Sequence, residues 1–161
     1  MAAGFTSSTS HIRIYVDADA CPVKGEVLRV AERHGLAVHM VSNSWMRLPD
    51  SPLIHRKVVA AGPDAADDWI AGEVGSLDIV VTADIPLAAR CLKKGARAIG
   101  MTGKPFTTDS IGMALAMRDL KAHLRETGMP GGDNPVFSRT DRSAFLMALE
   151  DAVQAVRRGR T

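Results

Sequence analysis

Carboxylates follow two apolar segments of this sequence, each at the point where the segment ends. Asp17 and Asp19 come directly after residues 12–16, and Asp84 follows residues 77–82. Between them lies a segment with helical spacing that carries three more acids, Asp64, Asp67 and Asp68. Carboxylates held together without cations raise one another's pKa values, so such a cluster favours a bound divalent cation. Mg²⁺ and Mn²⁺ both prefer carboxylate and water oxygens, and either would suit the site.

Divalent ions held by clustered carboxylates can activate water and stabilise the leaving oxygen when a phosphodiester is cleaved. The spacing therefore predicts a metal-dependent site with Asp17 and Asp84 at its centre. An aspartate at a strand end or at the start of a helix is also a common capping residue, and for each acid taken singly this is the simpler interpretation. The grouping of Asp17, Asp19 and Asp84 after the two most apolar segments favours function.

The acids can meet only if the segments that carry them belong to one parallel sheet. Short apolar or β-branched runs predict five strands, at residues 12–17, 36–41, 53–59, 77–82 and 96–101. Segments with helical spacing separate most of these runs, which implies parallel strands joined by right-handed crossovers. In such sheets, sites form beyond the carboxyl ends of the strands where the strand order reverses. If the first and fourth predicted strands are neighbours there, Asp17 and Asp84 face each other.

The predicted fold class is α/β, with three layers and a mainly parallel sheet of about five strands. Helices cover both faces, and the helices of the C-terminal third pack on the sheet. A chain of 161 residues favours one domain, which we assign to residues 12–156. Residues 1–11 are predicted to be a disordered arm, 128–135 a loop and 157–161 a basic tail. Pro22 is expected in the first turn of the first helix, and Thr140 as the N-cap of the last helix.

Composition excludes several classes of protein. The net charge of +2 is too small to argue for nucleic-acid binding by itself. No apolar run approaches the roughly 20 residues of a membrane span, so no membrane association is expected. The two cysteines lie far apart and no secretory segment is evident, which predicts a protein of the reducing cytoplasm. The histidines show no zinc-like spacing, and no dinucleotide or Walker-type glycine pattern is present.

Several motifs in order carry a resemblance to a known family: IYVDADACPVK, GPDAADDWI, DIVVTADIPLAARCLKKGA, GMALAMRDL and FSRTDRSAF. With these, the chain resembles the YaiI/YqxD family of bacterial proteins and is similar to the PIN-like (NYN/PIN) nuclease superfamily. That resemblance implies clustered aspartates that use a divalent metal to cut RNA or DNA. The first acid of that superfamily ends strand one and matches Asp17, and its T-x-D pattern matches Thr82 and Asp84. For the helix acid it favours Asp67, with Asp68 second, or Asp64 if the NYN-type subgroup is the better comparison.

Three functions follow from these observations. The leading hypothesis is a nuclease that uses Mg²⁺ or Mn²⁺ and acts on nucleic acid, with RNA favoured. Its catalytic residues are Asp17 and Asp84, and its predicted metal ligands are Asp17, Asp19, Asp67, Asp68 and Asp84. The first alternative is a phosphatase of the haloacid-dehalogenase type, with Asp17 as nucleophile and Asp19 as general acid. The second is a non-catalytic RNA-binding module on a nuclease-like fold, and a homodimer is left open.

Polar residues outside the acidic cluster are weaker candidates for contacts with a phosphate backbone. Those predicted to bind substrate are Asn43, Lys104, Arg118 and Arg142. Arginine suits bidentate phosphate contacts, but an ion pair of Arg118 with Asp119 that ties the two late helices together is the stronger interpretation. A turn-forming role is an equal alternative for Asn43, and a solvated turn at residues 103–105 is the stronger interpretation for Lys104.

Overall fold

The computed structural model describes residues 12–60, 62, 64–128 and 137–159 of the chain. Within these ranges six strands form one sheet. In chain order they are β1 (Arg13–Asp17), β2 (Ala37–Ser42), β3 (Ile54–Val58), β4 (Ile79–Val81), β5 (Arg97–Ile99) and β6 (Pro105–Phe106). They lie side by side in the order β3-β2-β1-β4-β5-β6, and every neighbouring pair is parallel except β5 with β6. The predicted α/β class with a mainly parallel sheet is confirmed.

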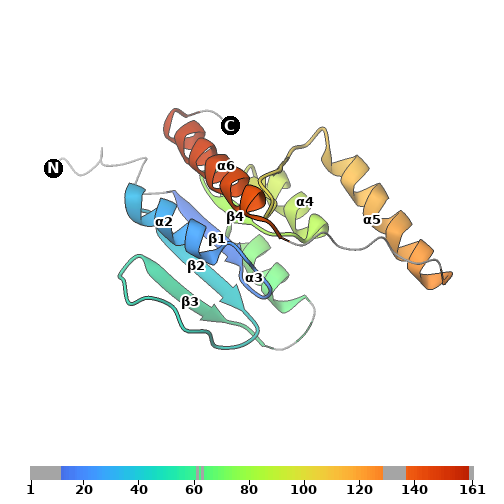
Figure 1. The fold of residues 1–161 in the computed structure, drawn as a ribbon, viewed down its shortest axis with the longest axis horizontal. Coiled ribbons are helices and arrows are strands. Elements are labelled where there is room, and N and C mark those ends of the chain that lie inside the picture. The colour runs from blue at the N-terminus through green and yellow to red at the C-terminus, as the bar shows by residue number, and fades with distance from the viewer. Residues whose placement is uncertain (1–11, 61, 63, 129–136, 160–161) are drawn as a thin grey trace.

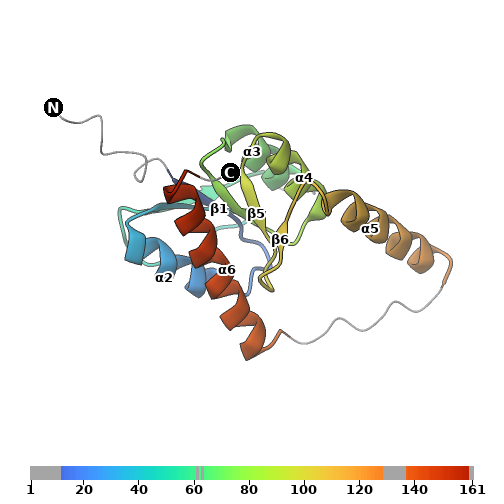
Figure 2. The ribbon, with the colours of Figure 1, turned by 90° about the horizontal axis from the view of Figure 1, so that it is seen from above.

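Five helices occur in the described part of the chain: α2 (Lys24–His34), α3 (Ala65–Glu73), α4 (Ile85–Lys93), α5 (Ile111–Glu126) and α6 (Arg139–Arg157). Figure 1 shows α2 and α6 in front of the sheet and α3 and α4 behind it, so the molecule has three layers. The view from above in Figure 2 shows the same division, with α5 extending beyond α4 away from the sheet. None of these helices is long and apolar enough to cross a membrane.

Strand β1 lies at the centre of the core because its side chains point alternately to the two faces. Ile14 and Val16 pack against residues of α2 and α6. Tyr15 points to the other face and packs against residues of α3 and α4. All three side chains are fully buried. A strand covered on both faces reads as a continuous apolar run rather than an alternating one, which explains why this segment is so distinct in the sequence.

The first helix begins later than the sequence suggested. Pro22 was expected in its first turn, but α2 begins at Lys24 with Val23 as N-cap, and it ends at His34 with Gly35 as C-cap. Gly35 has a φ of 67° and its backbone N–H donates to carbonyls of the last turn, as expected for a left-handed C-cap. Pro22 is outside the helix because the turn at residues 19–20, where Ala20 has a φ of 59°, intervenes after β1.

The N-cap of the last helix lies two residues before the predicted Thr140 cap. Ser138 is the N-cap of α6: its Oγ accepts from the Asp141 backbone N–H at 3.0 Å, and Asp141 Oδ2 accepts from the Ser138 N–H at 2.9 Å. This reciprocal pair is a capping box with Asp in place of the usual Glu. Thr140 therefore lies in the first turn, because the residue three positions before Asp141 is better placed to cap.

Strand β6 was not predicted. The chain leaves β5, turns at Gly103 with a φ of 94° and returns antiparallel to β5 at residues 105–106. The turn is closed by the Gly100 N–H, which donates to the Lys104 carbonyl at 2.8 Å. A Cβ on Gly103 would lie 2.7 Å from the backbone of Ala144 in α6. Glycine is needed here for both the backbone conformation and the close approach of α6.

A partly buried ion pair at the amino ends of the strands was also not predicted. Asp78 is 1% exposed and receives Arg13 Nε at 3.2 Å and Arg13 Nη2 at 2.9 Å. Its carboxylate also accepts from the backbone N–H groups of Arg13 and Gly75. Because Asp78 precedes β4 by one residue, it joins β4 to β1 at the edge of the sheet opposite Asp84. The predicted arm at residues 1–11 and most of the predicted loop at 128–135 lie outside the described residues.

Candidate functional site

The strand order reverses between β1 and β4. The chain passes from β1 outward to β2 and β3, then returns to the other side of β1 at β4 and continues to β5. Asp17 is the last residue of β1, and Asp84 follows β4 as the N-cap of α4. The two acids therefore lie at adjacent carboxyl ends, at the switch point where open α/β sheets place their ligands. The expected adjacency of the first and fourth predicted strands is confirmed.

Thr82 links the two acids through its side-chain hydroxyl. Its Oγ1 donates to Asp17 Oδ2 at 2.9 Å, and accepts from the Asp84 backbone N–H at 2.9 Å. The Thr82 side chain is fully buried, so its position does not depend on solvent. Asp84 Oδ1 in turn accepts from the Leu87 N–H at 2.9 Å and caps α4. Asp84 therefore both caps α4 and belongs to the candidate site. The Thr82 hydroxyl fixes the position of Asp17 relative to Asp84.

Asp67 approaches this pair from α3. The helix buries Ala66 and Ile70 against the sheet, and this packing turns Asp67 inward so that it is half-buried. Burial, the charge of Asp84 and a side-chain hydrogen bond with Asp84 together raise the pKa of Asp67 to about 7, and Asp17 and Asp64 add smaller contributions. At a pH below about 7 a carboxyl with this pKa keeps its proton beside a carboxylate acceptor.

Asp17 is perturbed in the same direction. Burial is the largest cause that raises its pKa, and the charges of Asp84 and Asp19 raise it further, while the hydrogen bond from Thr82 opposes the shift. Among the ion pairs of the described residues, none joins a lysine or arginine to Asp17, Asp67 or Asp84. The three acids therefore form a negative cluster without a basic partner, from three separate elements.

Asp19 lies at the outer edge of this cluster. It is exposed, and its Oδ2 accepts from the Asn43 backbone N–H at 2.9 Å. The Asn43 side chain donates to the Ala60 carbonyl at 3.1 Å. Asn43 thus joins the loop after β1 to the segment after β3, which agrees with a turn-forming role and leaves its amide nitrogen engaged.

The other two acids of this segment, Asp64 and Asp68, are exposed, unlike Asp67. Asp68 is exposed and forms an ion pair with Arg90 of α4 at 2.8 Å. Asp64 occupies the N-cap position without a side-chain capping bond and is exposed. It acts on Asp67 through its charge. Of the helix acids, only Asp67 hydrogen-bonds to the cluster in the part of the chain that the structure describes.

Within the described residues, the side chains as placed include no group of three His, Cys, Asp or Glu side chains gathered closely enough to hold a metal ion. Asp67 and Asp84 are in direct contact, and Asp17 is joined to them through Thr82. The donors are nevertheless all carboxylate oxygens, which are the ligands that hard divalent cations prefer. The cluster therefore fits Mg²⁺ or Mn²⁺ in the chemistry of its donors.

Of the remaining predicted substrate contacts, the two arginines make other contacts and the lysine is exposed. Arg142 donates to the Pro22 carbonyl at 2.6 Å and lies 5.0 Å from the Phe137 ring, so it fastens α6 to the start of α2. Arg118 pairs with Asp119 at 3.7 Å within α5, and the prediction that this pair ties the two late helices together is wrong. Lys104 is exposed in the turn between β5 and β6.

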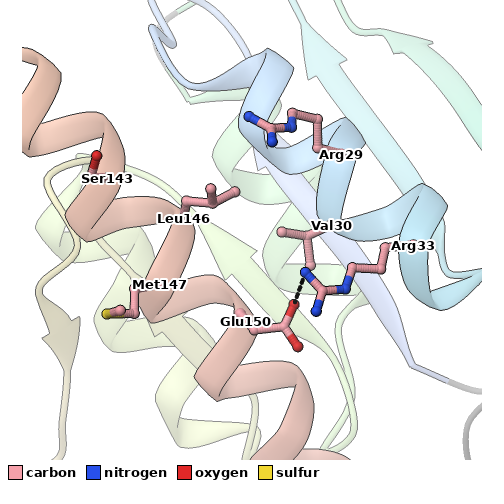
Figure 3. Close-up of a pocket in the computed structure, with 7 residues that line it drawn as sticks. All are labelled: Arg29, Val30, Arg33, Ser143, Leu146, Met147 and Glu150. Carbon is pink, nitrogen blue, oxygen red and sulfur yellow. Dashed lines mark ion pairs between the residues drawn. The ribbon is translucent and has the colours of Figure 1, made fainter.

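Two cavities lie elsewhere on the surface. A groove of about 430 Å³ runs between α2 and α6, with Arg29 and Arg33 on one side and Leu146 and Met147 on the other (Figure 3). A second cavity of about 750 Å³ lies between α6 and the β5–β6 edge. Neither is lined by Asp17, Asp67 or Asp84, so the acidic cluster is a separate feature at the carboxyl edge of the sheet.

Comparison with known proteins shows which family the chain belongs to. A sequence model of the family described as "Uncharacterized BCR, YaiI/YqxD family" matches residues 15–155. The chain belongs to this family. Among its YaiI/YqxD relatives, a UPF0178 protein of Parvibaculum lavamentivorans is 67% identical over 145 residues, which cover 90% of this chain and 95% of the relative. A UPF0178 protein of Rhodospirillum rubrum is 59% identical over 150 residues, covering 92% of this chain and 100% of the relative.

The YaiI/YqxD match begins within β1 and ends within α6. The residue that sequence reasoning undervalued is Thr82, whose hydroxyl contacts both site acids. Its signal was present, because a threonine that ends a fully buried strand needs a hydrogen-bond partner. Cys21 lies in the core, and burial raises the pKa of its thiol.

Proposed function

We propose that this protein is a divalent-metal-dependent nuclease of PIN-like type that hydrolyses phosphodiester bonds in RNA. The observation that supports the proposal most is the contact between Asp67 and Asp84, which lies beside Asp17 and raises the pKa of Asp67 to about 7. Carboxylates that raise one another's pKa values are stabilised when a positive charge is placed between them. Perturbed carboxyls at a switch point are typical of functional sites.

Asp17, Asp67 and Asp84 would hold the metal, and Asp19 would contact it or its water ligands from the edge. When bound, a divalent cation supplies the positive charge that this cluster lacks, and it supports attack of water on phosphorus. The residues themselves have distinct tasks. Asp67 loses its proton, Thr82 holds Asp17 in place through its hydrogen bond, and Asp84 is held rigidly by its capping bond to α4.

An exposed aromatic side chain supports nucleic acid as the substrate class. Trp45 follows the carboxyl end of β2 by three residues and is 65% exposed. The Arg56 guanidinium lies 4.9 Å from the centre of its ring, and Arg56 Nε donates to the Met46 carbonyl. An aromatic ring with an arginine beside it can stack on an unpaired base. Because its loop also carries Asn43, which binds Asp19, a single strand could pass from Trp45 to the acids.

The proposal is tested by measuring Mn²⁺ binding and RNA cleavage together. Calorimetry at pH 8 is expected to show Mn²⁺ binding by the wild type and loss of binding in Asp67→Asn. Cleavage of end-labelled single-stranded RNA in Mn²⁺ should be lost in the same variant. Asp68→Asn is the matched control, since Asp68 is an exposed neighbour paired with Arg90, and it should keep both properties.

Two outcomes would overturn the proposal. If Asp67→Asn and the wild type bind Mn²⁺ equally, the acidic cluster is not the metal site. If the wild type binds Mn²⁺ but cuts neither RNA nor DNA, the chain is a metal-binding module rather than a nuclease. The phosphatase alternative predicts instead that Asp17 carries a phosphoryl group during the reaction. A fluoroberyllate, which mimics that group, would then bind to Asp17.

A further inference from the structure

Helix α5 leaves its apolar face uncovered. None of its 16 residues is buried, whereas α2 and α6 bury apolar residues against the sheet. Figures 1 and 2 show α5 projecting beyond α4, away from the rest of the molecule. Four of its large apolar side chains are exposed, at 70% for Met113, 44% for Met117, 49% for Leu120 and 37% for Leu124.

These four side chains form a continuous stripe, because their spacing is four, three and four residues. This is the a/d spacing of a helix that packs against a second helix along a narrow seam. A helix of this length is only marginally stable in water by itself, and helices in proteins gain most of their stability from a packed apolar face. We therefore expect a second helix to pack on the stripe.

We propose that the α5 helix of a second copy of this chain covers the stripe, with the two helices antiparallel about a twofold axis. A spacing of four, three and four is the same in both directions along the helix. A reversed second copy thus brings Met113 beside Leu124 of that copy, and Met117 beside its Leu120. No apolar side chain is left over, as a twofold interface built from one patch requires.

The distribution of charge on α5 favours this antiparallel pairing. Residues 111–117 carry no charge, and the second half of the helix carries the charged residues Arg118, Asp119, Lys121, Arg125 and Glu126. Antiparallel packing sets each charged half against an uncharged half, whereas parallel packing would bring the two Lys121 side chains together at one end.

Small residues beside the seam complement the long ones in the same arrangement. Ala114 and Ala116 flank the first half of the stripe, and Lys121 and His123 flank the second half. In the antiparallel pair, Ala114 lies next to Lys121 of the second copy and Ala116 next to its His123. The methylene stem of Lys121 can then cover the edge of the apolar seam while its ammonium group remains in water. The surface is separate from the acidic cluster, and the proposal does not depend on nuclease activity.

The full chain is tested by light scattering after gel filtration and by sedimentation, over concentrations from about 1 to 200 µM, since dimerisation follows mass action. The wild type is expected to dimerise. Met117→Glu places a charge in the seam and should weaken the dimer on the order of tenfold or more. Met147→Glu is the matched control, because Met147 is 68% exposed on α6, and it should dimerise as the wild type does. Far-UV circular dichroism and urea unfolding establish that each variant is folded.

Cysteine cross-linking tests the direction of the helices. Met113 and Leu124 are 11 positions apart, about 16 Å along one helix, which is too far for a disulfide within a chain. The double variant with cysteine at both positions should form cross-linked dimers, and neither single variant should. Cross-linking by the single variants would show parallel packing. A wild type that is monomeric at every concentration, or a Met117→Glu variant that still dimerises fully, would overturn the proposal and leave a segment of this chain or another protein as the covering partner.

Discussion

Replacement of Asp67 by asparagine should stabilise the metal-free protein at alkaline pH. Asp67 is half-buried beside Asp84 and Asp17, and burial with the charge of Asp84 raises its pKa to about 7. Between pH 4 and pH 7 the folded chain therefore retains a proton that the unfolded chain has released. The free energy of unfolding of the wild type falls as the pH rises through this window and levels off above it. Asparagine keeps the hydrogen-bonding shape and has no charge to lose.

The size of the effect follows from the pKa difference. A rise from 3.8 to about 7 corresponds to about 4 kcal/mol if nothing screens the charges. The Asp67 side chain is only half-buried, and water screens part of the repulsion, so we expect a gain of about 1–2 kcal/mol for Asp67→Asn at pH 8. At pH 5.5 the folded chain keeps this proton while the unfolded chain has already released it, so roughly half of the gain should remain, and it should disappear only near pH 4.

Urea unfolding in EDTA at pH 5.5 and pH 8 measures this difference directly, with Asp68→Asn as the control. Asp68 is exposed and paired with Arg90, so its replacement should cost less than about 1 kcal/mol at either pH. Addition of Mn²⁺ at about 100 times its dissociation constant should then stabilise the wild type by about 2.7 kcal/mol at pH 8 and leave Asp67→Asn unchanged. The reasoning is refuted if Asp67→Asn is no more stable relative to the wild type at pH 8 than at pH 5.5.

Three further substitutions test the structure around the site by urea unfolding. Thr82→Val removes a buried hydroxyl bonded to a carboxylate and should lower the free energy of unfolding by about 1.5–3 kcal/mol; a loss below about 0.5 kcal/mol would contradict the bridging role. Gly103→Ala forces a Cβ to within 2.7 Å of the α6 backbone and should lower the free energy of unfolding by about 2–4 kcal/mol. Gly112→Ala, in open space on α5, should raise it by up to about 1 kcal/mol. Equal effects of the two substitutions would argue against the close approach of α6 to Gly103. Asp78→Ala removes a buried carboxylate that accepts from the partly exposed Arg13 side chain and from two backbone N–H groups, and it should cost about 1–3 kcal/mol; a neutral result would show that these bonds contribute little.

Much of the fold could be predicted from local sequence because its signals are local. Runs such as residues 77–82 are short and apolar because β4 is covered on both faces, and the alternation with helices implies parallel strands. Strand β6 escaped prediction because it has only two residues. Its pairing depends on the turn at Gly103 and on the approach of α6, which are contacts between distant parts of the chain.

The sequence predicted the two acids of the candidate site that follow strands, Asp17 and Asp84. It left open which acid of α3 joins them. Asp17 and Asp84 follow strands, so parallel topology alone brings them together. Asp67 and Asp68 are adjacent on α3 and differ by about 100° around the helix axis. Which of them faces the site depends on how α3 rolls on the sheet, and that is set by Ala66 and Ile70 packing into the core.

The sequence by itself determined the class of fold, the family and the two acids at the ends of β1 and β4. Periodicity and strand-end position depend on neighbouring residues, so they can be recognised without knowledge of distant contacts. Only the tertiary structure decided that Asp67 meets Asp84 while Asp68 binds Arg90. It also decided that α5 remains uncovered, because both outcomes depend on which helix faces find a partner in the folded chain.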